Sequence, residues 1–186
     1  MNRDFGAKTA IGPPKHIMNP TVILADYRNP VHQKVIVDLL DEYARHPMGG
    51  GQPLAPRVRE ELLPALRDIQ GAFSVLAFVE GTPAGLINCF QGFSTFRCQP
   101  LINIHDVMVS APFRGNDLSG RMLEKVEQIA RQRGCCKLTL EVLEGNPVAR
   151  RSYEKAGFRG YELDPAMGKA LFMEKKLEGN GDWYNA

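Results

Sequence analysis

The chain has 186 residues, of which 44% are hydrophobic and 24% charged, and its formal net charge is +2. These values are ordinary for a folded globular protein and exclude a disordered or fibrous class. A charge this small, with scattered Lys and Arg, gives no basis for a nucleic-acid partner, and no apolar run reaches the roughly 18–20 residues of a membrane span.

Composition along the chain predicts one domain with short extensions. Residues 1–20 mix Gly, Pro and charge without a period, so we expect an N-terminal arm. Residues 21–178 are expected to form a single domain, and residues 179–186 a polar tail. The first residues lead into no apolar signal region, which indicates a cytoplasmic protein without a membrane partner.

The four cysteines favour neither a disulfide framework nor a metal site. Cys135 and Cys136 are adjacent, and Cys89 and Cys98 are nine positions apart, unlike C-x-x-C pairs. We therefore expect buried or partly buried free thiols and no bound metal.

The N-terminal half reads as strand, helix, loop and helix. Residues 21–25 are rich in β-branched side chains, and apolar residues at helical spacing predict helices over residues 30–43 and 58–70. Between the helices, residues 47–53 contain three consecutive glycines. No strand precedes these glycines and no Lys-Ser or Lys-Thr pair follows, which favours a flexible loop beside a substrate over a phosphate-binding P-loop.

The centre of the chain alternates strands with a helix. Residues 72–80 and 84–90 predict a β-hairpin, and residues 101–109 a central strand. An amphipathic helix over residues 118–134 and a strand over 137–142 complete a β-α-β unit. Such a unit requires parallel neighbouring strands and a right-handed crossover.

The last expected helix has clear signals at both ends. Asn146 is a helix cap, Pro147 suits the first helical position, and Gly157 suits the end. Residues 158–163 and 169–177 then predict a closing pair of strands. The elements together predict the α/β class, with a mixed sheet flanked by helices.

The turn between the central strand and the following helix suits a phosphate group. The N–H groups at a helix start are unsatisfied and carry partial positive charge, and Gly115 and Gly120 would permit close approach. The alternative is an ordinary loop in which Asn116 or Asp117 caps the helix. The turn matches neither the G-x-G-x-x-G fingerprint nor a Walker loop.

A carboxylate and a phenol lie near the last helix. Glu141 at a strand end can take a proton from a nucleophile, and Tyr153 can return one to a leaving group. His105 and Asp106 are the other candidate bases, and they face opposite sides of the sheet if their strand is regular. We rank Glu141 first, then His105, then Asp106, with a structural role as the alternative for His105.

Two stretches resemble the GNAT superfamily of N-acetyltransferases. Its pyrophosphate signature is Arg or Gln, two residues, Gly, one residue, then Gly or Ala. It falls here on Arg114, Asp117 and Ser119, so the match is partial. A carboxylate at position 117 would lie beside the phosphates and is expected to weaken CoA binding without abolishing activity.

The second stretch is a complete match. The superfamily's Asn, Ala, Tyr and Gly-Phe pattern falls on Asn146, Ala149, Tyr153 and residues 157–158. Within the superfamily, the ribosomal-protein N-terminal acetylating enzymes are the most similar, because they also place a strand Glu before the Asn and a Tyr after it. Glu141 and Tyr153 take those positions here.

The resemblance implies a fold, a cofactor site and catalytic roles. The central sheet would be splayed, and acetyl-CoA would be the co-substrate. Tyr153 would protonate the departing CoA thiolate, and Glu141 or His105 would accept a proton from the amine. The cofactor-binding residues implied by the resemblance are Val107, Met108, Val109, Arg114, Gly115, Asn116, Asp117, Leu118, Ser119, Gly120 and Asn146.

The expected activity is direct acetyl transfer to a primary amine, without a metal. A transferase of a longer acyl group and an inactive CoA-binding sensor are the alternatives. The amine acceptor, a small molecule or a peptide, cannot be read from the sequence. The oligomeric state is open as well, with a homodimer as one option.

Overall fold

The computed structural model describes residues 19–162, 164, 166, 168, 170–175 and 177. Residues 1–18 of the expected N-terminal arm and the whole of the expected tail, 179–186, lie outside the described residues. The arm's last residue, Pro20, is already the first residue of a strand.

The centre of the molecule is a mixed sheet of five strands in the order β1-β2-β3-β4-β5. Antiparallel pairing joins β1 to β2, β2 to β3 and β3 to β4, whereas β4 and β5 are parallel. The predicted hairpin and the β-α-β unit are therefore confirmed. The strands are β1 (Pro20–Leu24), β2 (Phe73–Val79), β3 (Thr82–Ser94), β4 (Gln99–Val109) and β5 (Leu138–Leu140).

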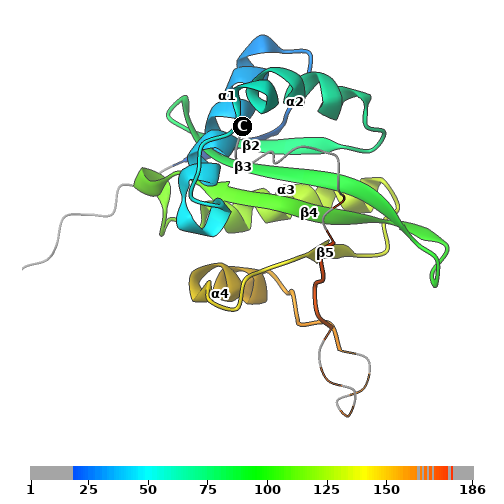
Figure 1. Ribbon diagram of the computed structural model, residues 1–186. Helices are drawn as coiled ribbons and strands as arrows, with labels where there is room; N and C mark the ends of the chain where they lie inside the picture. The colour runs from blue at the N-terminus through cyan, green and yellow to red at the C-terminus, as the bar shows by residue number, and fades with distance from the viewer. Residues whose placement is uncertain are drawn as a thin grey trace, which may run out of the picture.

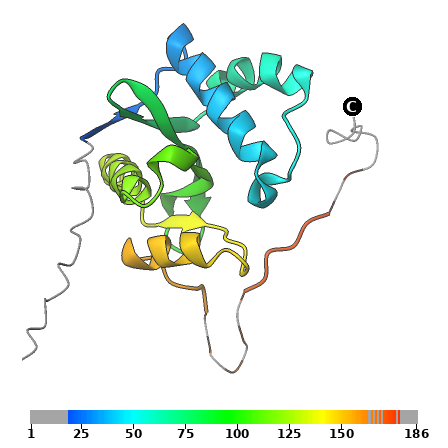
Figure 2. The ribbon, with the colours of Figure 1, turned by 90° about the vertical axis from the view of Figure 1, so that its left-hand side faces the viewer.

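Helices cover both faces of this sheet. Figures 1 and 2 show α1 and α2 on one face and α3 on the other, with α4 beside β5. The α-helices are α1 (Pro30–Arg45), α2 (Pro56–Asp68), α3 (Leu118–Gln132) and α4 (Pro147–Lys155), and two short 3-10 helices are η1 (Pro47–Gly49) and η2 (Ala111–Phe113). In the part of the chain that the structure describes, no helix combines the length and apolar character needed to cross a bilayer.

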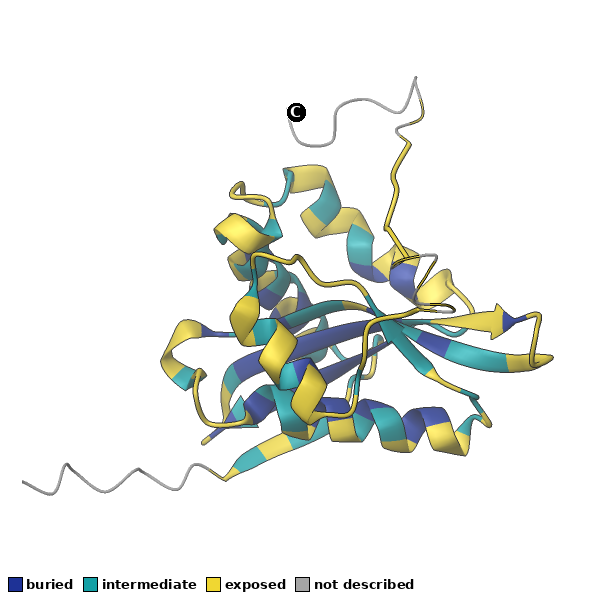
Figure 3. Ribbon diagram, turned by 90° about the horizontal axis from the view of Figure 1, so that it is seen from below, coloured by how far each residue is buried: buried dark blue, intermediate teal, exposed yellow. Residues whose placement is uncertain are grey.

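Each face of the sheet has its own hydrophobic core, because successive side chains of a strand point to opposite faces. On the α3 face, Ile87 of β3 packs with the fully buried Met122 and Val126. On the α1/α2 face, Leu86 packs with Ile36 of α1. Figure 3 shows the buried residues gathered in the central strands and along one side of α3.

The helix ends follow the local signals in the sequence. The Asn29 side chain accepts from the Val31 amide at the start of α1, and Asn146 accepts from the Ala149 amide at the start of α4. Gly134 and Gly157 follow α3 and α4 with φ angles of 68° and 93°, a conformation that glycine adopts without a steric penalty.

The predicted closing pair of strands is wrong for the described residues. Residues 159–162 and 170–175 contain no strand, although the Ala170 N–H donates a hydrogen bond to the Tyr161 carbonyl. Leu171 and Phe172 are exposed. Alternating apolar residues favour an extended chain, but a strand also needs a paired edge, which residue type alone does not specify. For the same reason β5 is shorter than residues 137–142.

Candidate active site

An opening forms where β4 and β5 separate. Their pairing ends at Ile104 and Leu140, whereas β4 continues to Val109 paired with β3 alone. After β5 the chain turns away from β4 toward α4 (Figure 1). Among the described residues, no strand pairs with the β5-facing edge of β4 at Val107, Met108 and Val109. Apart from the Val109 carbonyl, which accepts from Arg114, the outward-facing backbone groups of this edge are available to a ligand.

The turn from β4 to α3 is held by its own polar side chains. Arg114 Nε donates to the Val109 carbonyl at 2.9 Å, and Asn116 Nδ2 donates to the carbonyls of Phe113 and Arg114. Gly115 has a φ of 80°. These bonds present the start of α3 to solvent, and the N–H groups of its first turn lack partners within the helix.

Asp117 occupies the N-cap position of α3 without capping it. Its φ of 58° is left-handed, a conformation that glycine adopts freely and that Asp tolerates better than most residues. The Asp117 carboxylate pairs with Lys155 Nζ of α4 at 2.9 Å. A Cβ added to Gly120 would lie 2.9 Å from Asp117 Oδ1, so a larger residue there would require this carboxylate to shift.

A second contact joins the same two helices. The hydroxyls of Ser119 in α3 and Ser152 in α4 are 2.9 Å apart and share a hydrogen bond. Together with the ion pair of Asp117 and Lys155, it fixes α4 against the start of α3. The turn and the helix that carries Tyr153 are therefore held together.

Tyr153 is the buried residue of α4. Only 9% of its surface is exposed, and its ring packs edge-on against Phe158. Burial raises the pKa of Tyr153 to about 12, and the phenol of Tyr43 on α1 adds to the shift. Among the described residues, its hydroxyl has no hydrogen-bond partner. The phenol therefore holds its proton at neutral pH and can donate it to a ligand.

Glu141 follows β5 on the α1/α2 face of the sheet. Asn103 Nδ2 donates to Thr139 Oγ1 at 3.3 Å and makes long contacts of 3.5 Å to both Glu141 oxygens. This agrees with the alternation expected for Thr139 and Glu141. The carboxylate is exposed, so solvent screens its charge.

A β-bulge changes the orientation expected for His105 and Asp106. Asn88 of β3 pairs with Asp106, and the next residue, Cys89, pairs with Ile104, which leaves His105 as the extra residue. The His105 ring contacts Phe90 on the α1/α2 face, and Asp106 accepts a hydrogen bond from Asn88 on that same face. The two side chains therefore lie on one face instead of opposite ones.

The sequence contains a signal for this bulge. Ile102 and Ile104 pack on the α3 face, and so do Val107 and Val109. The two pairs are out of phase by one residue, which a regular strand with a period of two cannot accommodate.

Helix α1 adds residues that the sequence did not assign to the site. Tyr43 is half-buried, and its pKa is raised by burial and then by the carboxylate of Asp106. Ser110, at the end of β4, donates to Glu42 at 2.7 Å. The helical period places Tyr43 on the buried side of α1, but only the tertiary fold brings it to β4.

A separate groove lies along the first half of α1. Its volume is about 570 Å³, and Glu42 and Ser110 belong to its lining together with Val31, Asp38 and Pro83. Its lining includes neither Tyr153 nor Asp106, so we do not assign the chemistry to it.

All four cysteines are free thiols. Cys89 is buried and Cys135 and Cys136 are partly buried, as expected, whereas Cys98 is exposed. Cys89 is buried in the α3-side core, and burial raises its pKa well above the ordinary range. Within the described ranges, no three His, Cys, Asp or Glu side chains gather as a metal site would require.

Comparisons with known proteins agree with this architecture. An uncharacterised N-acetyltransferase of Bacillus subtilis (strain 168), YycN, is 38% identical over 68 residues. The alignment spans 37% of this chain and 42% of that protein, which is less than half of the relative's length.

Solved structures share the fold. An aminoglycoside N-acetyltransferase in complex with CoA has a TM-score of 0.65 at 13% identity, covering 89% of this chain and 99% of that one. A ribosomal-protein-alanine N-acetyltransferase from Brucella melitensis biovar Abortus 2308 has a TM-score of 0.59 at 17% identity, covering 78% and 99%. These two enzymes have different substrates but match the fold of this chain with similar TM-scores. The fold therefore does not single out the ribosomal-protein type.

The family itself is shown by a longer match. The model of the acetyltransferase (GNAT) family matches residues 36–158, which run from α1 to the end of the last motif and make up more than half of the chain. This range contains the separated strands, the turn before α3 and Tyr153. The chain therefore belongs to the GNAT family of acetyltransferases.

Proposed function

We propose that this protein transfers an acetyl group from acetyl-CoA directly to a primary amine. The observation that carries the proposal is Tyr153, a buried phenol without a hydrogen-bond partner in the described chain, on the helix tied to the start of α3. Such a phenol can protonate a departing thiolate.

The cofactor side of the site consists of a strand edge and a helix start. The free β5-facing edge of β4 would pair with the pantetheine arm, and a donor there would polarise the acetyl carbonyl. The N–H groups at the start of α3 suit a pyrophosphate. We assign cofactor binding to Val107, Met108, Val109, Arg114, Gly115, Asn116, Asp117, Leu118, Ser119, Gly120 and Asn146.

The acceptor side is the α1/α2 face of the same opening. Glu141, His105 and Asp106 all lie on this face, whereas the expected alternation had separated the last two. An amine is mostly protonated at neutral pH, so one of these groups must accept a proton before the nitrogen can attack.

The proposal is direct transfer without a covalent enzyme intermediate, and two of the four thiols are held in their unreactive form. Cys89 is buried in the core and its pKa is raised, and burial also raises the pKa of Cys135. A thiol with a raised pKa is a poor nucleophile, because the thiolate is the reactive form. The proposal places the enzyme in the cytoplasm, where acetyl-CoA is available.

The proposal is tested by acetyl-CoA calorimetry together with a thiol-release assay on a panel of primary amines. The panel contains spermidine, an aminoglycoside and a short peptide with a free N-terminus. We expect stoichiometric acetyl-CoA binding and amine-dependent thiol release. If neither is observed, the proposal is contradicted. If a longer acyl-CoA is preferred over acetyl-CoA in competition, the group that the enzyme transfers is the longer acyl group.

A further inference from the structure

A row of polar side chains crosses the otherwise apolar α1/α2 face of the sheet. The Tyr27 and Ser74 hydroxyls are 2.8 Å apart, Ser74 Oγ donates to Asn88 Oδ1 at 2.6 Å, and Asn88 Nδ2 donates to Asp106 Oδ2 at 3.0 Å. The row starts after β1 and passes across β2 and β3 to β4. We refer to Tyr27, Ser74 and Asn88 as the relay.

The hydrogen bonds of the relay all run in one direction. Ser74 gives its single proton to Asn88, so the hydroxyl of Tyr27 must be the donor to Ser74. The opposite orientation of Asn88 would set its carbonyl against the carboxylate. Burial raises the pKa of Tyr27, which keeps this first donor protonated. Every donor therefore points toward Asp106, and aligned bonds of this kind strengthen one another.

The position of the relay in the core shows that it is not a surface feature. Ser74 is fully buried and Asn88 is 4% exposed, among the apolar side chains of the α1/α2 core. Buried polar groups need partners, and apolar residues of similar size would fill these positions without that requirement. The relay ends on a carboxylate that is only partly buried, at the bulge in β4.

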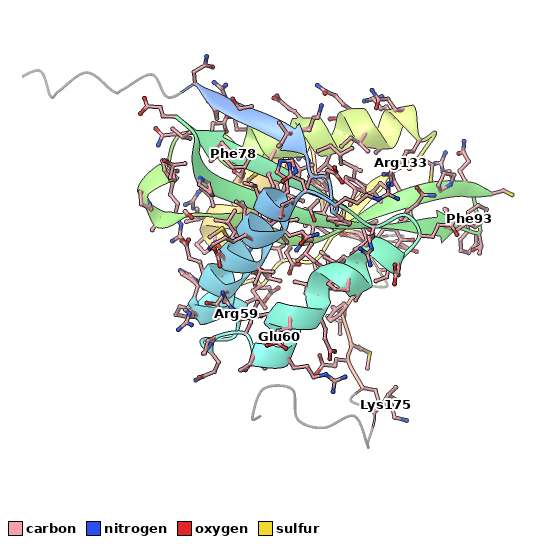
Figure 4. All side chains as sticks on the ribbon, turned by 90° about the horizontal axis from the view of Figure 1, so that it is seen from above. Arg59, Glu60, Phe78, Phe93, Arg133 and Lys175 are labelled. Atoms are coloured by element: carbon pink, nitrogen blue, oxygen red, sulfur yellow. The ribbon has the colours of Figure 1, made fainter. Side chains whose placement is uncertain are left out.

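Asp106 differs from Asp38 and Asp41, the two aspartates of α1, which both form ion pairs. Asp38 pairs with Lys34 and Arg59, and Asp41 pairs with Arg45 and Arg59, whose position on α2 is seen in Figure 4. Asp106 has no ion pair with any residue that the structure describes. Among the described residues its hydrogen-bond partner is the Asn88 amide, which donates to one carboxylate oxygen and leaves the other available.

Tyr43 of α1 lies within electrostatic range of both Asp106 and Tyr153. The charge of Asp106 helps to raise the pKa of Tyr43, and Tyr43 helps to raise the pKa of Tyr153. The titratable groups that interact with Asp106 are Tyr43 of α1 and Cys89 of β3, and His105 precedes it in β4 on the same face of the sheet. None of them is a fixed cation, so the space beside Asp106 suits a positively charged group.

We propose that Asp106 is the binding site for the ammonium group of the acceptor and accepts its proton, and that the relay positions Asp106. This inference rests on the proposed function and assigns the base within it to a residue that sequence ranking placed last. The ligand class is a primary ammonium.

The proton balance of the step is complete. Asp106 takes one proton from the ammonium, and the resulting neutral nitrogen forms the C–N bond at the acetyl carbonyl. The C–S bond breaks with its electron pair on sulfur, and Tyr153 protonates the thiolate. The nitrogen loses its second proton to the Tyr153 phenolate, and Asp106 releases its proton to water.

The first experiment compares Asp106→Asn with the wild type, using the panel amine that gives the fastest thiol release. We expect kcat/KM for the amine to fall by roughly 100-fold, the usual contribution of a positioned base. The acetyl-CoA dissociation constant should stay within about twofold, since Asp106 acts on the other substrate. Glu60→Gln, which removes an exposed carboxylate on α2 (Figure 4), is the matched control and should keep wild-type rates.

The second experiment separates positioning from a merely structural role. Ser74→Ala interrupts the relay, and we expect kcat to fall about fivefold while the amine KM changes little. In the Asp106→Asn background the same substitution should have no further effect, because residues that act through one another are not additive. Tyr27→Phe should give a smaller effect with the same pattern.

The outcomes distinguish this inference from the proposed function. If Asp106→Asn turns over at the wild-type rate while Glu141→Gln does not, the base is Glu141. The assignment of Asp106 is then wrong, and the proposed acetyl transfer is unaffected. The role of the relay is also contradicted if Ser74→Ala slows the wild type and Asp106→Asn equally. If the wild-type protein neither binds acetyl-CoA nor releases thiol with any panel amine, both proposals are overturned.

Discussion

The side chain of Tyr153 owes its suitability as an acid to its surroundings. Burial raises its pKa from 10.0 to about 12, so the phenol is protonated throughout the neutral range. We expect Tyr153→Phe to lower kcat by roughly 100-fold, because the thiolate would leave without a proton donor. Thiol release measures this loss, and acetyl-CoA affinity should be unchanged. Wild-type turnover in the variant would remove Tyr153 from the acid role.

The same shift has a consequence for stability. A phenol whose pKa is raised in the folded state stabilises that state below pH 10, and the contribution is lost as pH rises through about 12. Between pH 9 and 12, the free energy of unfolding should therefore fall more steeply in the wild type than in Tyr153→Phe. Urea denaturation at several pH values measures this free energy for both proteins. If it falls equally with pH in both, the raised pKa of Tyr153 is contradicted.

Asp117 is predicted to weaken cofactor binding through its charge. Asp117→Asn keeps a side chain that tolerates the left-handed backbone and removes the negative charge beside the phosphate site. We expect acetyl-CoA to bind about fivefold more tightly, equivalent to about 1 kcal/mol of relieved repulsion.

Asp117→Gly serves as the second variant, because it removes the charge and the strained side chain together. Calorimetry should give similar gains for both variants. Unchanged affinity in both would show that pairing with Lys155 already neutralises the carboxylate.

Single residues of the site were predictable where a local pattern specified them. Asn146 caps α4, as the sequence predicted, whereas the burial of Tyr153 is seen only in the structure. Ser74 and Asn88 were not assigned, although each is a lone polar residue within an apolar strand. Their hydrogen-bond partners lie on other strands, and the sequence of a single strand does not show which residues of the neighbouring strands lie opposite.

Helix α4 depends on Asn146 for its start, and the proposed pantetheine contact depends on the same side chain. Asn146 Oδ1 accepts from the Ala149 amide at 3.1 Å. Removing this cap in Asn146→Ala should lower the free energy of unfolding by about 1 kcal/mol and weaken acetyl-CoA binding.

Asn146→Asp separates the two roles. Aspartate is also a good N-cap, so stability should be close to that of the wild type, whereas the amide donor to the pantetheine is lost. Denaturation and calorimetry on the two variants test this. If Asn146→Asp binds acetyl-CoA as tightly as the wild type, Asn146 has only the capping role.

The positions of the helices could be predicted from the sequence more closely than the pairing of the strands. Hydrophobic periods and caps predicted α1, α3 and α4 closely. The bulge at His105 and the early end of β5 depend on how neighbouring strands match. These two irregularities shape the site: the first brings His105 and Asp106 to one face, and the second leaves an edge of β4 free.

The sites proposed for the two substrates lie on different sides of one opening in the sheet. The start of α3 and α4 provide the proposed cofactor side, and α1 with the relay provides the proposed acceptor side. Long β3 and β4 strands extend past both to a hairpin end with the exposed Phe93 (Figure 4). The layered α/β class was predictable from element order, but the acceptor side was not, because it is assembled from α1, β2, β3 and β4.

The most direct test follows the acetyl group itself. Acetyl-CoA carrying an isotope-labelled acetyl group is incubated with the wild-type protein and the panel amines, and the products are analysed by mass spectrometry. We predict that the label appears in an amide of one of the amines, at a rate that falls sharply in Tyr153→Phe and in Asp106→Asn. Label found only in free acetate or left in acetyl-CoA would contradict acetyl transfer to an amine.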